Sequence, residues 1–327
     1  MVKKYWRIWG DQYSSLPSFL NRVSQNNAHG ILLCPEEAAC NLRQQNDYSY
    51  LEPYQNNGNF TFIFGAYDYN FYKNNTMLYN LPNVSLKLWK DFFLYYSFKT
   101  ANDLNYYPTS NIKCLFTCMN NKAHSHRTEL MDMLAKNSLL KNNFYSWHKP
   151  KEAVGIEYKP KYFDNKKCLL DGEFTSHKQQ YFPSQMYQSL ISLVSESDID
   201  IPFITEKTYN CLLFGKMFVI YGYPGIHNQL FSMGFRLPYN IIDYNSFDFI
   251  QDNTLRAGKI ARELKRISIT YKNLDQLHKE FLPLIGHNRN RMIEILHAQK
   301  DIPQEIFEHN YYVEFIQDIK CKLDLLD

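Results

Sequence analysis

Two adjacent residues of opposite charge, Glu206 and Lys207, follow an apolar stretch and a short polar loop. Thr205 precedes them as a candidate helix N-cap, so the spacing predicts that both lie in the first turn of a helix. Backbone N–H groups and the positive helix end favour an anion there, and a lysine adds a full positive charge. The pair therefore fits a diphosphate site in which the carboxylate accepts hydrogen bonds from ribose hydroxyls. It also fits a capped helix with a solvated lysine, and on spacing alone that is the commoner case.

A second cation, Arg127, lies at another predicted junction between a strand and a helix. The apolar run 112–118 predicts a strand, and residues 119–127 predict a loop that leads into a helix. A guanidinium can bind a phosphate through two parallel hydrogen bonds, which an ammonium group cannot do. Asn121 and His126 belong to the same loop. His126 is a candidate either for the phosphate or for the helix cap, and we favour the cap.

The elements that position these residues form a predicted β-α-β-α-β unit. Short apolar runs at 190–194 and 217–221 predict buried strands, and the helix between them is expected to end at Gly215. A helix at 226–233 and a strand near 239–242 complete the unit. Alternating strands and helices of this kind favour a parallel sheet that is covered on both faces.

The N-terminal region offers carboxylates at a strand end. Runs at 5–9 and 30–34 predict strands, and Glu36 and Glu37 follow the second strand directly. In open α/β sheets, ligands gather beyond the carboxyl ends of the strands, so each glutamate is a candidate general base. The same two carboxylates would also complement the dipole of a following helix, and position alone favours that interpretation.

One stretch resembles a known donor-binding signature. Residues 203–207 (Phe-Ile-Thr-Glu-Lys), Asn210 one turn later and an apolar strand that ends at Tyr221 and Gly222 are similar to the corresponding segment of α-1,3-fucosyltransferases. Residues 121–127, with the pattern Asn-x-x-x-x-His-Arg, resemble uncharacterised viral and bacterial relatives of those enzymes. In that family the arginine contacts the phosphates of the donor.

The resemblance implies an α/β fold of the GT-B type, with two Rossmann-like domains that face each other across a cleft. We expect an acceptor-side domain at 1–105, a nucleotide-sugar-binding domain at 106–290, and C-terminal helices at 291–327 that return to the first domain. The family inverts the anomeric centre and needs no metal in the active site. The donor-site residues that the resemblance implies are Asn121, His126, Arg127, Glu196, Thr205, Glu206, Lys207, Asn210, Tyr221 and Gly222.

The general base stays open between two places in the first region. The family carries a Glu-Ser-Pro-like element after a comparable strand, which Glu36 or Glu37 matches loosely. Residues 58–68 resemble a second family segment, Phe-Asn-Trp-Thr-x-x-Tyr-x-x-Asp, which would bring Tyr67 and Asp68 near the interdomain cleft. Asp68 is therefore the rival candidate for the base, whereas Tyr67 has either a packing role or a site role.

The expected activity is transfer of a sugar, with fucose as one candidate, from a GDP- or UDP-linked donor to a hydroxyl group, most simply on a glycan. The nucleotide sugar is the donor substrate, and no other cofactor is expected. A different reading is a metal-dependent glycosyltransferase, in which Asp198 and Asp200 would hold the ion on the diphosphate. The sequence is also compatible with a transferase that acts on modified DNA bases and with a non-catalytic protein that binds sugar nucleotides.

Composition limits the partners and the compartment. The 327 residues suffice for two domains, and 45% hydrophobic with 21% charged residues is an ordinary globular balance. A net charge of +3 argues mildly against nucleic acid and against a membrane surface. No run reaches the ~18 apolar residues of a membrane span, and no apolar segment follows the N-terminal charges. Seven scattered cysteines, with Cys114 and Cys118 as core thiols, fit a reducing compartment. We therefore expect a cytoplasmic protein, in the host cytoplasm if the source is viral.

The remaining segments give coarser predictions. Residues 99–109 lose apolar periodicity and are the best candidate for an interdomain link. Residues 145–187 are expected to be rich in loops. Residues 254–279 predict one amphipathic helix with a solvated basic face that includes Arg256. The chain from residue 288 onward has a helical pattern.

Overall fold

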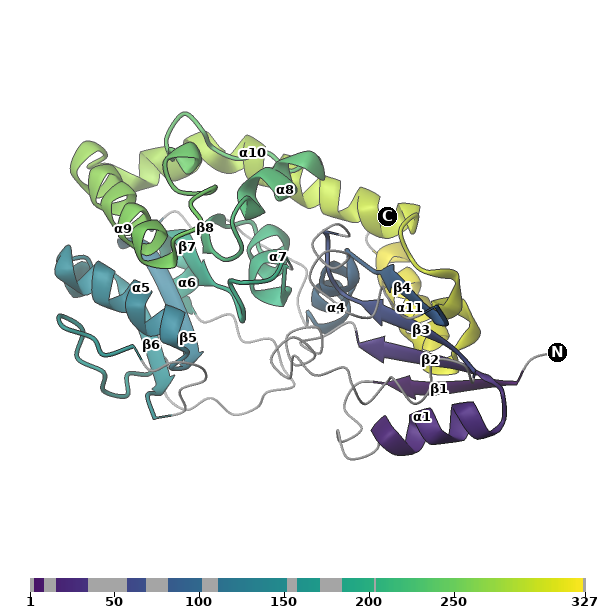
Figure 1. Cartoon of the computed structure of the whole chain (residues 1–327). Helices are drawn as coiled ribbons and strands as arrows, with labels where there is room; N and C mark the ends of the chain where they lie inside the picture. Colours follow the sequence, from purple (N-terminus) through teal and green to yellow (C-terminus); the bar gives the residue numbers. More distant parts are fainter. Residues whose placement is uncertain are drawn as a thin grey trace. The chain divides into compact units, whose positions relative to one another are not determined.

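The computed structural model describes residues 3–8, 16–34, 58–68, 82–101, 111–151, 158–170, 184–202 and 204–325. They form a mixed α/β protein with two four-stranded sheets in which all paired strands are parallel (Figure 1). The described residues fall into two compact units. Unit 1 draws on Met1–Lys99, Ile201–Ile204 and Ile295–Asp327, and unit 2 draws on Thr100–Asp200 and Thr205–Glu294.

The sheet of unit 1 follows the order of the chain. Its strands are β1 (Lys4–Ile8), β2 (His29–Cys34), β3 (Asn59–Phe64) and β4 (Val84–Leu88). Helix α1 (Leu16–Gln25) connects β1 to β2, and α4 (Phe92–Thr100) follows β4. Gly30 lets α1 pack closely on β2, because a Cβ atom there would lie 2.8 Å from a methyl group of Val23. In β3 every residue after Asn59 is buried, as expected for a parallel strand that is covered on both faces.

Aromatic side chains fill the contact between α4 and α11 (Asn310–Asp324) within unit 1. The indole of Trp89 is fully buried, and its ring meets the rings of Tyr312 and Phe315 edge-on at centroid distances of 5.9 and 6.3 Å. Lys322 of α11 donates through Nζ to two carbonyls in the last turn of α4, where the helix dipole favours a cation. These three aromatic residues of unit 1 therefore serve packing.

The sheet of unit 2 has the order β6-β5-β7-β8. Its strands are β5 (Cys114–Lys122), β6 (Phe144–Lys149), β7 (Ser189–Ser195) and β8 (Met217–Tyr221). The helices that begin in unit 2 are α5 (Ser125–Lys136), α6 (Ser184–Tyr187), α7 (Glu206–Leu213), α8 (Ile226–Ser232), α9 (Asn253–Thr270) and α10 (Leu274–Ala298). Short 3-10 helices occupy Leu140–Asn142, Tyr244–Ser246 and Gln304–Glu308. No helix in the described part of the chain is long and apolar enough to cross a membrane.

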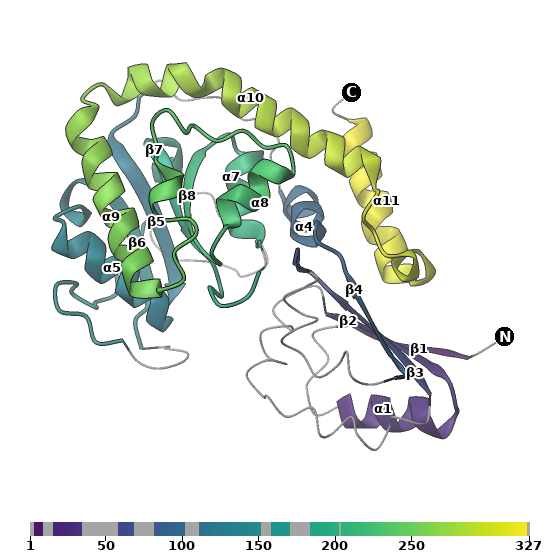
Figure 2. The ribbon, with the colours of Figure 1, turned by 45° about the horizontal axis from the view of Figure 1, so that its top comes forward.

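The connections of this second sheet run in opposite directions from its two central strands. Strand β5 leads through α5 to its outer neighbour β6, and β7 leads through α7 to its outer neighbour β8. Because such crossovers are right-handed, α5 and α7 cover opposite faces of the sheet. Helix α9 packs against α5 (Figure 2). The strand order therefore reverses between β5 and β7.

The predicted elements around α7 are confirmed. The runs at 190–194 and 217–221 form β7 and β8, and every residue of both strands is buried. The hydroxyl of Thr205 accepts a hydrogen bond from the backbone N–H of Lys207, so Thr205 is the N-cap of α7. Gly215 follows the end of that helix in the left-handed conformation, with φ of +63°. Local sequence signals were sufficient here.

The predicted strand near 239–242 is wrong. The carbonyl of Pro238 accepts hydrogen bonds from the backbone N–H groups of both Ile241 and Ile242, at 3.0 and 2.9 Å. These bonds close a turn, and both isoleucines are buried in the core. The apolar run thus reflects packing of a turn, and the predicted β-α-β-α-β unit has only its first two strands.

Three further boundaries differ from the prediction. Strand β5 continues to Lys122, so Asn121 lies in a strand and the expected loop is reduced to residues 123–124. Strand β6 lies inside the region that was expected to be rich in loops. Only Ser146 and Trp147 of this strand are buried, so its sequence has little apolar pattern from which a strand could be predicted. The single helix expected at 254–279 is two helices, and the Asn273 side chain caps the second by accepting from the backbone N–H of Gln276.

A buried carboxylate on α5 fixes the segment 158–163. Asp132 Oδ1 accepts hydrogen bonds of 2.6 to 2.9 Å from the backbone N–H groups of residues 161–163, and its Oδ2 accepts one of 3.0 Å from the Tyr158 hydroxyl. Burial raises the pKa of Asp132, but these hydrogen bonds outweigh burial and hold the pKa below its usual value. The segment is therefore anchored to α5 by one charged group.

Replacing Asp132 with alanine is expected to release this segment. Three consecutive N–H groups lose their acceptor, and we expect a loss of about 2 kcal/mol in the free energy of unfolding. Limited trypsin digestion should cut faster after Lys161, Lys166 and Lys167. Asp164→Ala is the matched control, because Asp164 is exposed and pairs with Lys166 at the surface. Equal digestion rates in both variants would contradict the anchoring role.

Candidate anion-binding site

The loops that follow β5 and β7 lie at the reversal of strand order in unit 2. In open α/β sheets, the two connections that leave such a point in opposite directions open a crevice at the carboxyl ends of the strands, where ligands bind. Arg127 is in the first turn of the helix after β5. Glu196 and Lys207 come from the loop after β7 and the helix that follows it. In the described part of unit 1, the strand order follows the chain and has no such reversal.

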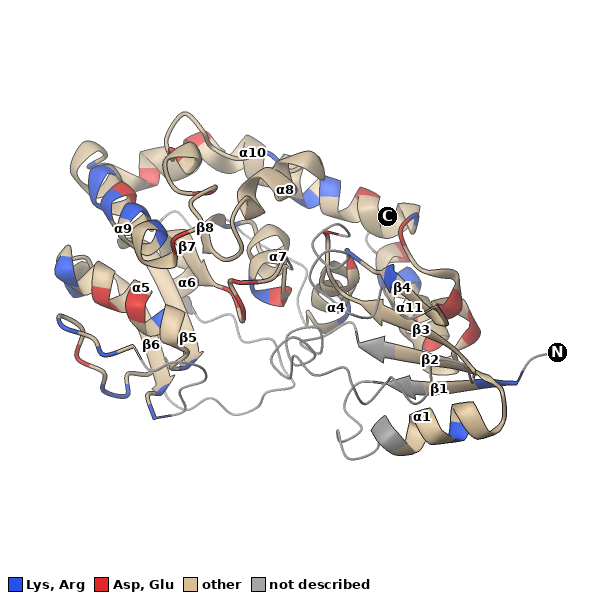
Figure 3. Cartoon of the chain, viewed as in Figure 1, with Lys and Arg blue, Asp and Glu red and all other residues tan. Residues whose placement is uncertain are grey.

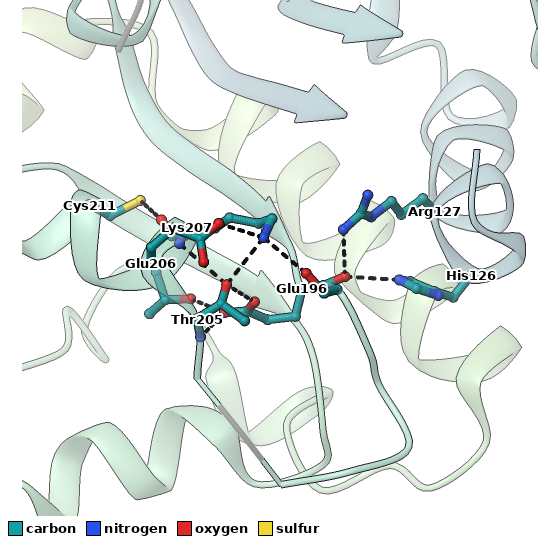
Figure 4. A network of polar contacts seen from close by, with 9 residues as sticks. His126, Arg127, Glu196, Thr205, Glu206, Lys207 and Cys211 are labelled. Carbon is teal, nitrogen blue, oxygen red and sulfur yellow. Dashed lines mark hydrogen bonds and ion pairs between the residues drawn. The ribbon is translucent and has the colours of Figure 1, made fainter. Parts of the chain in front are cut away.

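Glu196 is the structural centre of this site (Figure 4). Its carboxylate is fully buried and accepts hydrogen bonds from the backbone N–H and the hydroxyl of Thr205 and, at 2.7 Å, from the hydroxyl of Thr208. Burial raises the pKa of Glu196, and the nearby charge of Lys207 opposes that shift without cancelling it. Because the carboxylate is fully engaged, Glu196 joins the end of β7 to the start of α7. These contacts support a role for Glu196 in stabilising the loop.

The close packing around the Glu196 side chain requires a glycine at position 222. The backbone N–H of Glu196 donates to the carbonyl of Tyr221, which brings the loop after β7 against the end of β8. A Cβ atom at Gly222 would lie 3.2 Å from Cγ of Glu196 and 2.9 Å from the side chain of Ile226. The glycine thus permits the close approach of the Glu196 side chain, and its place in the predicted site has a steric basis.

The first turn of α7 presents Lys207. Its Nζ donates to Ser197 Oγ at 2.9 Å and to Glu206 Oε1 at 2.8 Å. About a third of the Lys207 side chain and a quarter of the Glu206 side chain are exposed, so ligands can reach both. Burial raises the pKa of Glu206, but Lys207 and Arg127 outweigh it and keep the pKa below its usual value. Glu206 is therefore ionised at neutral pH.

Arg127 and His126 reach the same loop from α5. Arg127 is 4% exposed, and its Nη2 donates to the backbone carbonyl of Glu196 at 3.1 Å. His126 Nε2 lies 3.0 Å from that carbonyl, and because a carbonyl only accepts, Nε2 carries the proton. The prediction that His126 caps the helix is wrong, since His124 occupies the N-cap position. Burial and the charge of Arg127 lower the pKa of His126 to about 3, so the ring is neutral.

The two cations converge on neighbouring residues. Arg127 binds the carbonyl of Glu196 and Lys207 binds the hydroxyl of Ser197, and bond lengths place these two oxygens within about 5 Å. Adding the two hydrogen bonds, Arg127 Nη2 and Lys207 Nζ lie no more than about 11 Å apart. Both charges, after burial, also help to lower the pKa of His124 to about 4. Arg127 and Lys207 therefore act together on the surroundings of this loop, and two such cations suit an anion.

Arg256 is a third cation near this site, and its predicted surroundings are wrong. The sequence pattern indicated a solvated basic face, but Arg256 is 2% exposed in the first turn of α9. Its guanidinium lies 5.4 Å from the ring centroid of Tyr221, and that ring lies 6.1 Å from the ring of His126. Its helical spacing with Ile260 and Ile267, both buried, was the signal that could have identified it.

The side chains of the remaining predicted donor residues, Asn121, Asn210 and Tyr221, do not join the hydrogen-bond network around the Glu196 carboxylate. Asn121 and Asn210 each have a buried side-chain oxygen, and among the described residues neither oxygen has a hydrogen-bond partner. The ring of Tyr221 packs between Arg256 and His126, and its hydroxyl donates to the carbonyl of Asn253. Burial raises the pKa of that hydroxyl. Tyr221 thus acts as a packing surface for the charged groups.

The first-region carboxylates and the Asp-x-Asp pair have different surroundings. Glu36 and Glu37 lie outside the described residues, and Asp68 follows β3 in unit 1. Asp198 Oδ1 accepts a hydrogen bond of 2.7 Å from the backbone N–H of Asp200, which forms a local turn. Among the residues described, no group of three or more His, Cys, Asp or Glu side chains has a geometry that could hold a metal ion.

The arrangement can bind a group with two or more negative charges through fixed cations and neutral histidine rings. A helix N-terminus, an ammonium group and a guanidinium group point to the same loop, and the partly exposed carboxylate beside them, Glu206, is already paired with Lys207.

Comparison of the chain with protein-family models, with curated proteins and with solved structures found no match to any of them.

Proposed function

We propose that this chain is an inverting glycosyltransferase of the GT-B type that takes its sugar from a GDP- or UDP-linked donor. The observation that supports it most is the convergence of Arg127 and Lys207 on Glu196 and Ser197 at the reversal of strand order. A nucleotide diphosphate carries its charge on two linked phosphates, and each of two neighbouring cations can pair with one of them. The fucosyltransferase-like motif assigns the same two side chains to the donor.

In the proposed reaction, the bond between the anomeric carbon and the diphosphate breaks and negative charge develops on the leaving phosphate oxygen. Fixed cations that face this oxygen stabilise the transition state without reorganisation, which is the role of Arg127 and Lys207. The Glu206 carboxylate accepts hydrogen bonds from the ribose hydroxyls. A carboxylate of unit 1, with Glu36, Glu37 and Asp68 as candidates, takes the proton of the acceptor hydroxyl as that oxygen attacks from the opposite face.

A panel of nucleotides and nucleotide sugars tests this proposal by thermal shift. GDP, UDP and their sugar conjugates are compared with the monophosphates, because the proposal requires recognition of the diphosphate. A ligand at 100 times its dissociation constant raises the free energy of unfolding by about 2.7 kcal/mol, which is a measurable rise in Tm. Transfer that survives EDTA would exclude the metal-dependent reaction. A panel in which no diphosphate raises Tm would contradict the proposal.

A further inference from the structure

A lysine-rich surface loop lies at the far end of α5 from Arg127. The segment 158–170 contains four lysines and one aspartate, so it has the same net charge of +3 as the whole chain. Its exposed basic and aromatic side chains are Lys159, Lys161, Lys166, Lys167 and Tyr162. Figure 3 shows this loop with its basic positions beside the end of α5. The small net charge of the chain thus conceals a local concentration of positive charge.

The loop is held in place at both ends. Asp132 accepts hydrogen bonds from three of its backbone N–H groups, as described above. Further along, Cys168 exchanges two backbone hydrogen bonds with Trp147 of β6. Phe163 is buried against the Trp147 ring at a centroid distance of 5.3 Å. Its lysines therefore extend from an ordered frame, which reduces the entropy lost when a ligand binds.

An exposed aromatic ring lies among these charges. Tyr162 is 56% exposed, and Lys136 Nζ from the last turn of α5 lies 5.6 Å from its ring centroid. Lys136 extends the basic surface onto α5, whose first turn contains Arg127. Lys136 comes nine positions after Arg127, which corresponds to about 14 Å along the helix axis. A chain of a few sugar units can span that distance.

We propose that the surface formed by Lys136 and the loop 158–170 binds the acceptor, a sugar polymer that carries negative charges. This inference rests on the proposed function, because a glycosyltransferase must bind an acceptor hydroxyl as well as its donor. The lysines neutralise carboxylate or phosphate groups, and the face of Tyr162 stacks on a sugar ring. A nucleic acid fits less well, because the loop 158–170 exposes one aromatic ring, Tyr162, and not the several rings on which successive bases stack.

Binding of defined polysaccharides to the full chain tests the proposal. The probes are polygalacturonate for carboxylates, a phosphorylated mannan for phosphates, neutral dextran, and a single-stranded oligonucleotide. The variant replaces all four loop lysines, Lys159, Lys161, Lys166 and Lys167, with glutamine. Its matched control replaces four exposed lysines elsewhere, Lys272, Lys279, Lys300 and Lys320, so that both variants lose the same charge.

We expect the chain to bind at least one of the charged polysaccharides, more weakly as salt increases, and not to bind dextran. The loop variant should bind it about tenfold more weakly, as the sum of four exposed ion pairs, whereas the control should bind as the unchanged chain does. Equal losses in the two variants, binding of the oligonucleotide alone, or binding of dextran as tight as that of the charged probes would overturn the proposal.

This experiment distinguishes a failure of the acceptor-surface proposal from a failure of the glycosyltransferase proposal. The loop variant should keep its thermal shift with nucleotide diphosphates, because its substitutions lie away from Arg127 and Lys207. The Lys207→Met variant should lose that shift and keep its affinity for the charged polysaccharide. A chain that binds the polysaccharide through the loop but binds no nucleotide diphosphate would refute the transferase and leave the glycan surface in place.

Discussion

Replacing Lys207 with methionine is expected to lower sugar transfer by about 100-fold or more, because it removes one of the two fixed charges that the proposed mechanism places against the leaving diphosphate. Methionine has a similar length, so the fold of α7 should be kept. The ammonium group also partners Glu206 and Ser197, and its loss leaves Glu206 without its ion pair. The measurement is the rate of nucleoside diphosphate release from a donor that the thermal-shift panel has identified.

Two companion variants separate the catalytic effect from a structural one. Glu206→Gln combined with Lys207→Met removes the unpaired carboxylate and should restore any lost thermal stability without restoring transfer. Lys279→Met removes an exposed lysine of α10 and should leave both transfer and Tm unchanged. Transfer at a near-normal rate in the Lys207→Met protein would remove Lys207 from the mechanism.

Replacing Glu196 with alanine is expected to destabilise the chain by about 3 kcal/mol or more. The backbone N–H and hydroxyl of Thr205 and the hydroxyl of Thr208 all lose their acceptor, and both threonines are fully buried. Glu196→Gln keeps one acceptor oxygen and should cost less. Urea unfolding measures both variants. Glu280→Ala, on an exposed face of α10, is the control and should change the free energy of unfolding by no more than about 0.5 kcal/mol.

The difference in the free energy of unfolding between the unchanged chain and the Glu196→Gln variant should depend on pH. Burial raises the pKa of Glu196 above its ordinary value of 4.5, so the folded protein binds this proton more tightly than the unfolded chain does. The stabilisation from this carboxyl is complete below pH 4.5 and is lost as the pH rises through the raised pKa. The advantage of the unchanged chain over Glu196→Gln should therefore shrink as the pH rises above 4.5. An advantage that stays constant or grows with pH would refute the raised pKa of Glu196.

The sequence was most informative where local signals decide the structure. An apolar run fixes a buried strand such as β7, and a threonine before Glu206 and Lys207 fixes the start of α7. The same rules misplaced the segment after α8, because Ile241 and Ile242 are apolar for packing in a turn that Pro238 closes. Periodicity does not distinguish a short buried strand from a short buried turn.

The geometry of the site depends on contacts that no local pattern contains. The hydrogen bond from Arg127 to Glu196 joins residues 69 positions apart, and the strand order that brings them together is a property of the whole sheet. The anchoring carboxylate of Asp132 and the burial of Arg256 depend in the same way on distant segments. The resemblance to fucosyltransferases supplied the site residues, but no local pattern indicated that Glu196 would be buried and fully bonded.

A crystal structure of the chain with GDP or UDP bound would test the central claim most directly. We predict that the guanidinium of Arg127 and the Nζ of Lys207 both lie within hydrogen-bond distance of oxygens of one diphosphate, above the loop that begins at Glu196. A diphosphate bound elsewhere, or one that contacts only one of these two cations, would contradict the account.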